Sequence, residues 1–145
     1  NSKRSDREIA KVLRVSQPTI TRLRKKLEKE AIANYTVVPD FPTLGYDLMA
    51  FTLISSTGAK PEAIEKTKEW AKKRPNIIFA SQGEGMNING IMISLHKDFA
   101  EYSKFMLELR RDWSELLKDV QTFLVSFEGS MILKPLSLTY LGEAK

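Results

Sequence analysis

The sequence contains no cysteine and a single histidine, His96, among its 145 residues. Without thiols the chain has no disulfide framework, no thiolate metal site and no cysteine nucleophile. One histidine without cysteines makes no metal cluster, and a catalytic triad would need a placed nucleophile that the sequence does not reveal. We therefore expect no metal, no cofactor and no catalytic residue, and we predict that the protein is not an enzyme.

Long hydrophobic runs are also missing. No stretch approaches the roughly 18 apolar residues that span a membrane, and no signal peptide is visible, although the chain starts at Asn1. We therefore expect a cytoplasmic protein that does not contact a membrane. The 42% of residues that are hydrophobic are enough to bury the core of one ordinary domain or of two small ones.

Acidic residues are scarce near the N-terminus. Residues 1–34 carry ten Lys or Arg and only four Asp or Glu, a net charge of +6, which leaves −1 for the rest of a chain whose total is +5. A positive charge confined to one end predicts a polyanionic partner for that end. The alternative is a basic surface that only meets solvent.

The same segment predicts two short helices. Ser5 and Glu8 form the capping box S-x-x-E ahead of the first helix, which is expected to stop near Arg14. Ser16 can cap the second helix, and Pro18 fits its first turn, where a backbone N–H would have no helical partner. Two such helices separated by about three residues are typical of a helix-turn-helix.

A helical wheel sorts the side chains of the second helix. Ile20, Leu23 and Leu27 share one face, which should dock on the first helix, while polar and basic residues occupy the opposite face and its flanks. The second helix of a helix-turn-helix reads bases with its N-terminal side chains and meets phosphate with its cations. We expect base or near-base contacts from Gln17, Thr19, Thr21 and Arg22, and phosphate contacts from Lys25, Lys26, Lys29, Lys3 and Arg4.

The ordered elements IAKVLRVSQPTITRLRKKLEKE, AIANYTVVPD and LGY resemble the DNA-binding half and hinge of Lrp/AsnC (feast/famine) transcriptional regulators. Members of that family place one more helix before the two found here, so we expect that residues preceding Asn1 were removed, cleaved or not ordered. The resemblance implies double-stranded DNA as partner and a homodimer that often assembles into tetramers or octamers. It also implies a regulatory domain that often binds amino acids.

The rest of the chain alternates strand and helix patterns. Strands are predicted at residues 48–55, 76–81, 90–95 and 120–128, and helices begin at Pro61 and at the capping box of Asp98 and Glu101. The order βαββαβ predicts a ferredoxin-like sandwich with both helices on one sheet face. The other face would expose apolar side chains unless a second copy covered it. The residues expected there are Met49, Phe51, Ile78, Ile91, Ile93, Phe123 and Val125, or their alternates.

We therefore predict an α+β protein with two functional parts. Residues 1–34 form a helix-turn-helix of the winged type that lacks its first helix, and residues 35–47 form a strand, Tyr35–Val38, and a linker. Residues 48–130 form the ferredoxin-like, RAM-type domain for regulation and dimerisation, and residues 131–145 form an unassigned tail. In the family the short strand pairs with its twin in a second subunit, and an ordinary edge strand is the alternative.

A Gly- and Asn-rich loop separates the second and third predicted strands. The resemblance places the amino-acid effector site there, and the candidates are Gly83, Gly85, Asn87 and Asn89. Family members carry an Asp in this loop, and neutral Asn cannot supply the charge that an ammonium group needs. The alternative is a plain hairpin in which Gly and Asn supply positive φ angles.

These observations favour a sequence-specific, homo-oligomeric DNA-binding transcriptional regulator with an amino-acid-like effector. The competing hypothesis is a ferredoxin-like small-molecule sensor or enzyme with no DNA role, whose basic end serves only docking or solubility.

Overall fold

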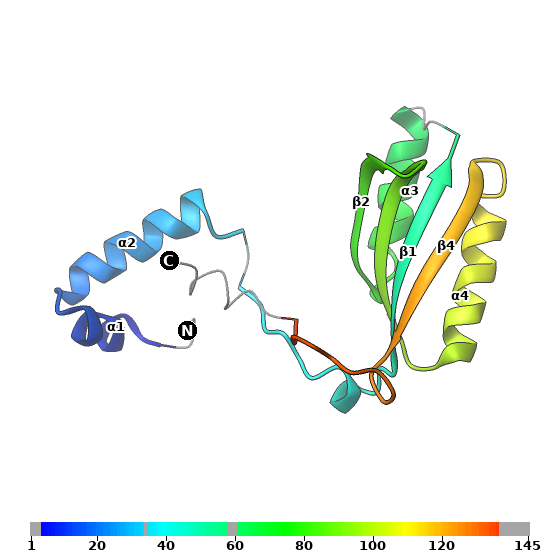
Figure 1. Cartoon of the computed structure of the whole chain (residues 1–145). Coiled ribbons are helices and arrows are strands. Elements are labelled where there is room, and N and C mark those ends of the chain that lie inside the picture. Colours follow the sequence, from blue (N-terminus) through cyan, green and yellow to red (C-terminus); the bar gives the residue numbers. More distant parts are fainter. Residues whose placement is uncertain (1–3, 34, 58–60, 137–145) are drawn as a thin grey trace. The chain divides into compact units, whose positions relative to one another are not determined.

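The computed structural model describes residues 4–33, 35–57 and 61–136 of the chain. The chain divides into two compact units, with the boundary between Val38 and Pro39 (Figure 1). The first unit holds two helices and the second holds a sheet with two further helices. Lys3, one of the predicted phosphate contacts, lies outside the described residues.

The first unit begins with α1 (Asp6–Leu13). Both bonds of the predicted capping box are present, because the Glu8 N–H donates to Ser5 Oγ at 3.3 Å and the Ser5 N–H donates to Glu8 Oε2 at 2.7 Å. The helix ends at Arg14, whose φ of 55° lies in the left-handed region. The predicted start and end of this helix are confirmed.

The second helix, α2 (Gln17–Glu30), also begins as its sequence predicts. Ser16 is the N-cap, and its hydroxyl accepts a hydrogen bond from the Thr19 N–H at 3.3 Å. Pro18 lies in the first turn, where its missing N–H costs no helical hydrogen bond.

Contact between α1 and α2 is short. Ala10 and Ile20 are buried, but Leu23 and Leu27 remain 47% and 51% exposed, so the predicted burial of these two leucines is wrong. The reason is length: the eight residues of α1 span roughly 12 Å and cannot cover the 14 residues of α2.

A polar contact completes this junction. The Asp6 carboxylate accepts from Thr21 Oγ1 at 2.7 Å and from Arg24 Nε at 2.6 Å, and Arg24 Nη2 donates to the Arg4 carbonyl at 3.1 Å. The Thr21 hydroxyl, followed by the Arg24 guanidinium, lowers the pKa of Asp6 below its usual value. Asp6 thus ties the start of α1 to the middle of α2.

The predicted strand at Tyr35–Val38 does not form within this single chain. A strand needs a second backbone to pair with, and none of the described segments supplies one. The chain instead continues through a short 3₁₀ helix, Pro42–Leu44, that ends at Gly45 with a φ of 80°.

The second unit confirms the predicted βαββαβ order and the α+β class. Its elements are β1 (Leu48–Ser56), α3 (Pro61–Lys72), β2 (Ile77–Gly85), β3 (Ile88–His96), α4 (Phe99–Asp112) and β4 (Leu117–Ser126). The strands form one antiparallel sheet in the order β2-β3-β1-β4 (Figure 1). Asp98 caps α4 by accepting from the Glu101 N–H at 2.7 Å.

The core lies between the sheet and its helices. Met92 of β3 packs with Phe105, Met106 and Leu109 of α4, and Trp70 of α3 packs against this cluster. Side chains alternate along a strand, so the neighbours of Met92 in β3 point to the opposite face of the sheet.

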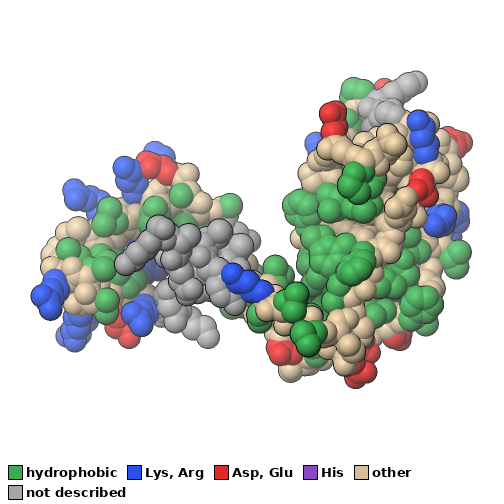
Figure 2. Space-filling model, in the orientation of Figure 1, with side chains coloured by type: hydrophobic (Ala, Val, Ile, Leu, Met, Phe, Trp, Pro, Cys, Tyr) green, Lys and Arg blue, Asp and Glu red, His purple; other side chains and the backbone are tan. Residues whose placement is uncertain are grey.

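That opposite face is apolar and only partly covered. Phe51 lies between Ile93 of β3 and Phe123 of β4 in the strand register, and Phe123 is 70% exposed. Figure 2 shows hydrophobic side chains gathered over the strands on this unit. We call this surface, which includes Met49, Phe51, Ile91, Ile93, Phe123 and Val125, the open sheet face.

The only histidine is fully buried under α4. His96 Nε2 shares a hydrogen bond of 2.9 Å with Ser94 Oγ, and its ring contacts Tyr102 and Phe105. Nδ1 is buried with no hydrogen-bond partner among the described residues. Burial lowers the pKa of His96 below its ordinary value of 6.5, against a smaller opposing effect of the Glu101 charge.

This environment predicts a pH-dependent stability. Below about pH 6.5 the unfolded chain binds a proton at His96 that the folded chain does not, so the free energy of unfolding falls as pH decreases toward the lower folded pKa. The slope approaches at most about 1.4 kcal/mol per pH unit. Urea unfolding at several pH values should show this slope in the wild type and a flatter one in His96→Gln. Equal slopes in the two proteins would contradict the assignment.

A second prediction concerns the Asp6 junction. Asp6→Asn removes the charge that holds Arg24 and should increase amide hydrogen exchange several-fold in α1 and α2, with no change in the four strands. Glu30→Gln is the control, since the Glu30 carboxylate only meets Lys26 at 3.9 Å in an exposed pair. Equal exchange in Asp6→Asn and Glu30→Gln would show that the junction adds no stability.

Candidate nucleic-acid interface and effector hairpin

The outward side of α2 carries a row of exposed cations. We call Arg22, Lys25, Lys26 and Lys29 the basic ridge. All four are exposed, and among the described residues no hydrogen bond or ion pair engages Arg22, Lys25 or Lys29. Lys26 makes only the exposed pair with Glu30. Figure 2 shows Lys and Arg side chains projecting from the helices of this unit.

One arginine of α2 is turned the other way. Arg24 lies between Arg22 and Lys25 of the ridge in sequence, yet its side chain is only 28% exposed and is held by Asp6. The Asp6 contact therefore separates a structural arginine from the cations that face solvent. Arg24 is not among the predicted DNA contacts, and nothing in the sequence pattern identified Asp6 as its partner.

The N-terminal residues of α2 divide into free and engaged side chains. Gln17, Pro18, Thr21, Arg22 and Lys25 line a shallow hollow on this helix. The amide of Gln17 has no hydrogen-bond partner among the described residues, and the residue is exposed. The Thr21 hydroxyl instead donates to Asp6.

Thr19 and Arg4 complete the predicted set. The Thr19 hydroxyl shares a 2.8 Å hydrogen bond with Ser16 Oγ at the cap. Arg4 is exposed, and its backbone carbonyl rather than its side chain receives Arg24. Of the four base-contact candidates, Gln17 and Arg22 thus keep unengaged polar groups, whereas the Thr19 hydroxyl is engaged at the cap of α2 and the Thr21 hydroxyl links α2 to α1.

The candidate effector loop is a tight hairpin. Met86 and Asn87 have φ angles of 51° and 60°, and Gly85 pairs with Ile88 across the turn. Two successive positive φ angles are the pattern of a type I′ two-residue turn. A positive φ at Asn87 agrees with the alternative of a plain hairpin. The positive φ at Met86 was not predicted. A Cβ at Gly83 would meet nothing within 4 Å, so no close contact demands glycine there.

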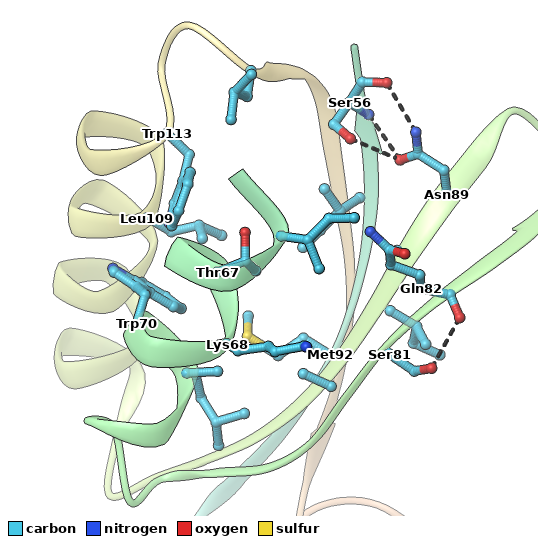
Figure 3. A pocket seen from close by; sticks show the side chains of 18 of the residues that line it. Ser56, Thr67, Lys68, Trp70, Ser81, Gln82, Asn89, Met92, Leu109 and Trp113 are labelled. Atoms are coloured by element: carbon cyan, nitrogen blue, oxygen red, sulfur yellow. Dashed lines mark hydrogen bonds between the residues drawn. The ribbon is translucent and has the colours of Figure 1, made fainter. Parts of the chain in front are cut away.

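Asn89 links two strands. Its Oδ1 accepts from the Ser56 N–H at 3.0 Å and from Ser56 Oγ at 3.1 Å, and its Nδ2 donates to the Ser56 carbonyl at 2.9 Å (Figure 3). The side chain thereby fastens the end of β1 to β3. The four effector candidates do not converge, because Asn89 lines a cavity that Gly83, Gly85 and Asn87 do not border.

That cavity was not predicted from the sequence. It has a volume of about 710 Å³ and lies between α3 and the sheet, with Trp113 and Leu109 closing one side (Figure 3). Ile64, Thr67, Trp70 and Ala71 of α3 all line this cavity, and their helical spacing puts them on one side of the helix. None of the residues of α3 is fully buried, so this face borders a cavity as well as the core.

Among the described residues, no cluster of three or more His, Asp or Glu side chains is arranged to hold a metal ion. No described helix is both long and apolar enough to cross a membrane.

Comparison with solved structures identifies the fold. The chain superposes on a transcriptional regulator from Neisseria meningitidis in complex with L-Met, with a TM-score of 0.76 and 20% identity over 97% of this chain and 90% of that one. It also superposes on an AsnC family transcriptional regulator from Agrobacterium tumefaciens, with a TM-score of 0.73 and 17% identity over 97% of this chain and 90% of that one. A third match is LrpC from B. subtilis, with a TM-score of 0.73 and 21% identity over 92% of this chain and 89% of that one. No family model and no curated protein matches the chain. At these identities the likeness shows that the chain has the fold of Lrp/AsnC transcriptional regulators.

Proposed function

We propose that the protein is a homo-oligomeric, sequence-specific DNA-binding transcriptional regulator of the Lrp/AsnC kind, acting in the cytoplasm. The observation that supports this best is the sorting of cations on α2. Arg24 is paired with Asp6, while Arg22, Lys25 and Lys29 face solvent with no partner among the described residues. The stability of the helix pair does not require these three charges on one side of one helix, and a basic surface that only meets solvent is the alternative.

The N-terminal part of α2 would enter the major groove. Gln17 and Arg22 have the free donors and acceptors that read base edges, where arginine favours guanine and glutamine favours adenine. Lys25, Lys26, Lys29, Lys3 and Arg4 would neutralise phosphates, and each neutralised phosphate steepens the salt dependence of binding by about 0.9 on a log–log plot. Thr19 and Thr21 would act by holding α2 in place.

A homodimer would supply two copies of α2. The open sheet face offers the apolar surface for this contact, since Phe123 and Phe79 are 70% and 50% exposed on it. Two recognition helices about 34 Å apart would read a pseudo-palindrome in successive major grooves. Tetramers or octamers built from such dimers remain part of this proposal.

A small amino-acid-like effector would modulate the regulator, as the L-Met complex of the structural neighbour suggests. The hairpin candidates Gly83, Gly85, Asn87 and Asn89 offer backbone groups and neutral amides. Calorimetry with a panel of amino acids on wild type and Asn89→Ala tests this site, and an absence of heat would leave only a structural hairpin.

The DNA proposal predicts that Arg22→Ala with Lys25→Ala lowers affinity at least tenfold, because one base contact and one phosphate contact are lost. The slope of log affinity against log salt concentration should also become shallower by about 0.9, the contribution of one phosphate contact. Fluorescence anisotropy on a duplex selected from random sequence, in about 0.1 M salt, measures both effects.

The control is Lys66→Ala with Lys73→Ala, which removes the same charge from exposed positions on and after α3. It should bind the duplex as the wild type does. If both double variants bind the duplex as tightly as the wild type does, the basic ridge is not the DNA contact. That result would favour the hypothesis of a small-molecule sensor or enzyme.

The oligomer proposal predicts that Phe123→Asp shifts the protein to monomers in sedimentation, because a charge enters the open sheet face. Leu107→Asp is a matched control, since Leu107 of α4 is also 70% exposed but lies on a helix. Identical sedimentation of both variants and the wild type would remove the open sheet face from the interface.

A further inference from the structure

The cavity under α3 has the size and lining of a small-molecule site. Its volume of about 710 Å³ falls within the range of roughly 300–1,000 Å³ that holds small ligands. Most of its lining is apolar, and the lining side chains come from three directions: α3, the sheet, and the segment from α4 to β4. They include Ile54, Ile64, Trp70, Met92, Leu109 and Trp113 (Figure 3).

Most neutral polar groups of the lining are already engaged. Asn89 is bonded three times to Ser56, and Thr67 Oγ1 donates to the Ala63 carbonyl at 2.8 Å. Ser81 Oγ donates to the Gln82 carbonyl at 2.9 Å. The walls therefore suit an apolar body, and among the described residues the Gln82 amide and the Trp113 indole N–H have no hydrogen-bond partner.

The charged groups of the lining are all of one sign. Lys68 and Lys72 border the cavity, and none of its lining residues is Asp or Glu. Lys68 Nζ pairs with Glu65 at 3.1 Å and Lys72 Nζ pairs with Glu69 at 3.2 Å, but these side chains are 59% and 68% exposed. Such exposed pairs contribute little, so either ammonium can exchange its helical carboxylate for that of a ligand.

We propose that this cavity binds an apolar carboxylate that lacks an ammonium group, such as a 2-oxo acid with a branched side chain. The apolar body lies against Trp70, Met92 and Trp113, and the carboxylate reaches Lys68 or Lys72. An amino acid fits less well, because its ammonium would be desolvated with no carboxylate in the lining to receive it. This site shares Asn89 with the hairpin candidates but not Gly83, Gly85 or Asn87, and it does not depend on DNA binding.

The protein carries its own reporter for this site. The chain has two tryptophans, and both Trp70 and Trp113 line the cavity. Intrinsic fluorescence of the full chain, without DNA, should change saturably on titration with α-ketoisocaproate. Leucine, which has an ammonium in place of the oxo group, and isocaproamide, which has no charge, should each bind about tenfold more weakly or not at all.

Variants locate the carboxylate contact. Lys68→Gln with Lys72→Gln should weaken α-ketoisocaproate about tenfold, whereas Lys66→Gln with Lys73→Gln, the same charge change outside the lining, should not. All four side chains are exposed, so folding is not at risk. Ala71→Phe, which fills the cavity, should abolish the fluorescence change while circular dichroism stays native.

Three results would overturn the proposal. One is the lack of any saturable signal with α-ketoisocaproate or isocaproate. Another is leucine binding as tightly as its oxo acid, which would indicate an amino-acid site. The third is equal weakening by the two lysine double variants, which would indicate a general charge effect. Because no DNA is present, failure here leaves the proposed regulator function untouched, and loss of DNA binding leaves this site untouched.

Discussion

The second unit is governed by a mismatch between one sheet and the helices that cover it. A four-stranded sheet has two faces, and α3 and α4 pack on only one of them. Removing apolar surface from water stabilises a protein by roughly 25 cal/mol for each Å². An exposed apolar sheet face therefore favours association with a partner. Phe51, flanked by Ile93 and Phe123, lies at the centre of that face. The same constraint makes a second copy the simplest cover, because a symmetric contact joins one surface to itself.

Charge sorting plays the corresponding part in the first unit. The helices α1 and α2 bury few side chains, so a polar junction at Asp6 supplies much of their fixed geometry. Asp6 engages the side chains of Arg24 and Thr21, so these two groups of α2 are not available to a ligand. The remaining cations then share one direction, which a polyanion can use and a folded core cannot. In the proposed function, stability and DNA recognition would therefore be divided between neighbouring residues of the same helix.

Much of this fold follows from local rules that the sequence displays directly. The capping box at Ser5 and the cap at Ser16 depend on residues three positions apart, and strand patterns depend on alternation, so each was predictable. The errors involve partners distant in sequence. Exposure of Leu23 and Leu27 depends on how far α1 reaches, and the strand at Tyr35–Val38 depends on a second backbone. The bonds of Asn89 to Ser56 and of Thr21 to Asp6 join residues far apart in the chain, which no periodicity reveals.

The cavity under α3 was missed for a related reason. A helical stripe shows which side of a helix points inward, but not how closely the helix approaches what it faces. Trp70 of α3 contacts the rings of Phe105 and Trp113. The space that remains adjoins Met92, whose neighbours Ile91 and Ile93 point to the open sheet face. The proposed ligand under α3 and a partner subunit on the sheet would therefore contact adjacent residues of one strand. The ligand would change the affinity for the partner subunit only if it bound more tightly to one of two positions of β3. The partner subunit would then change the affinity for the ligand by the same factor.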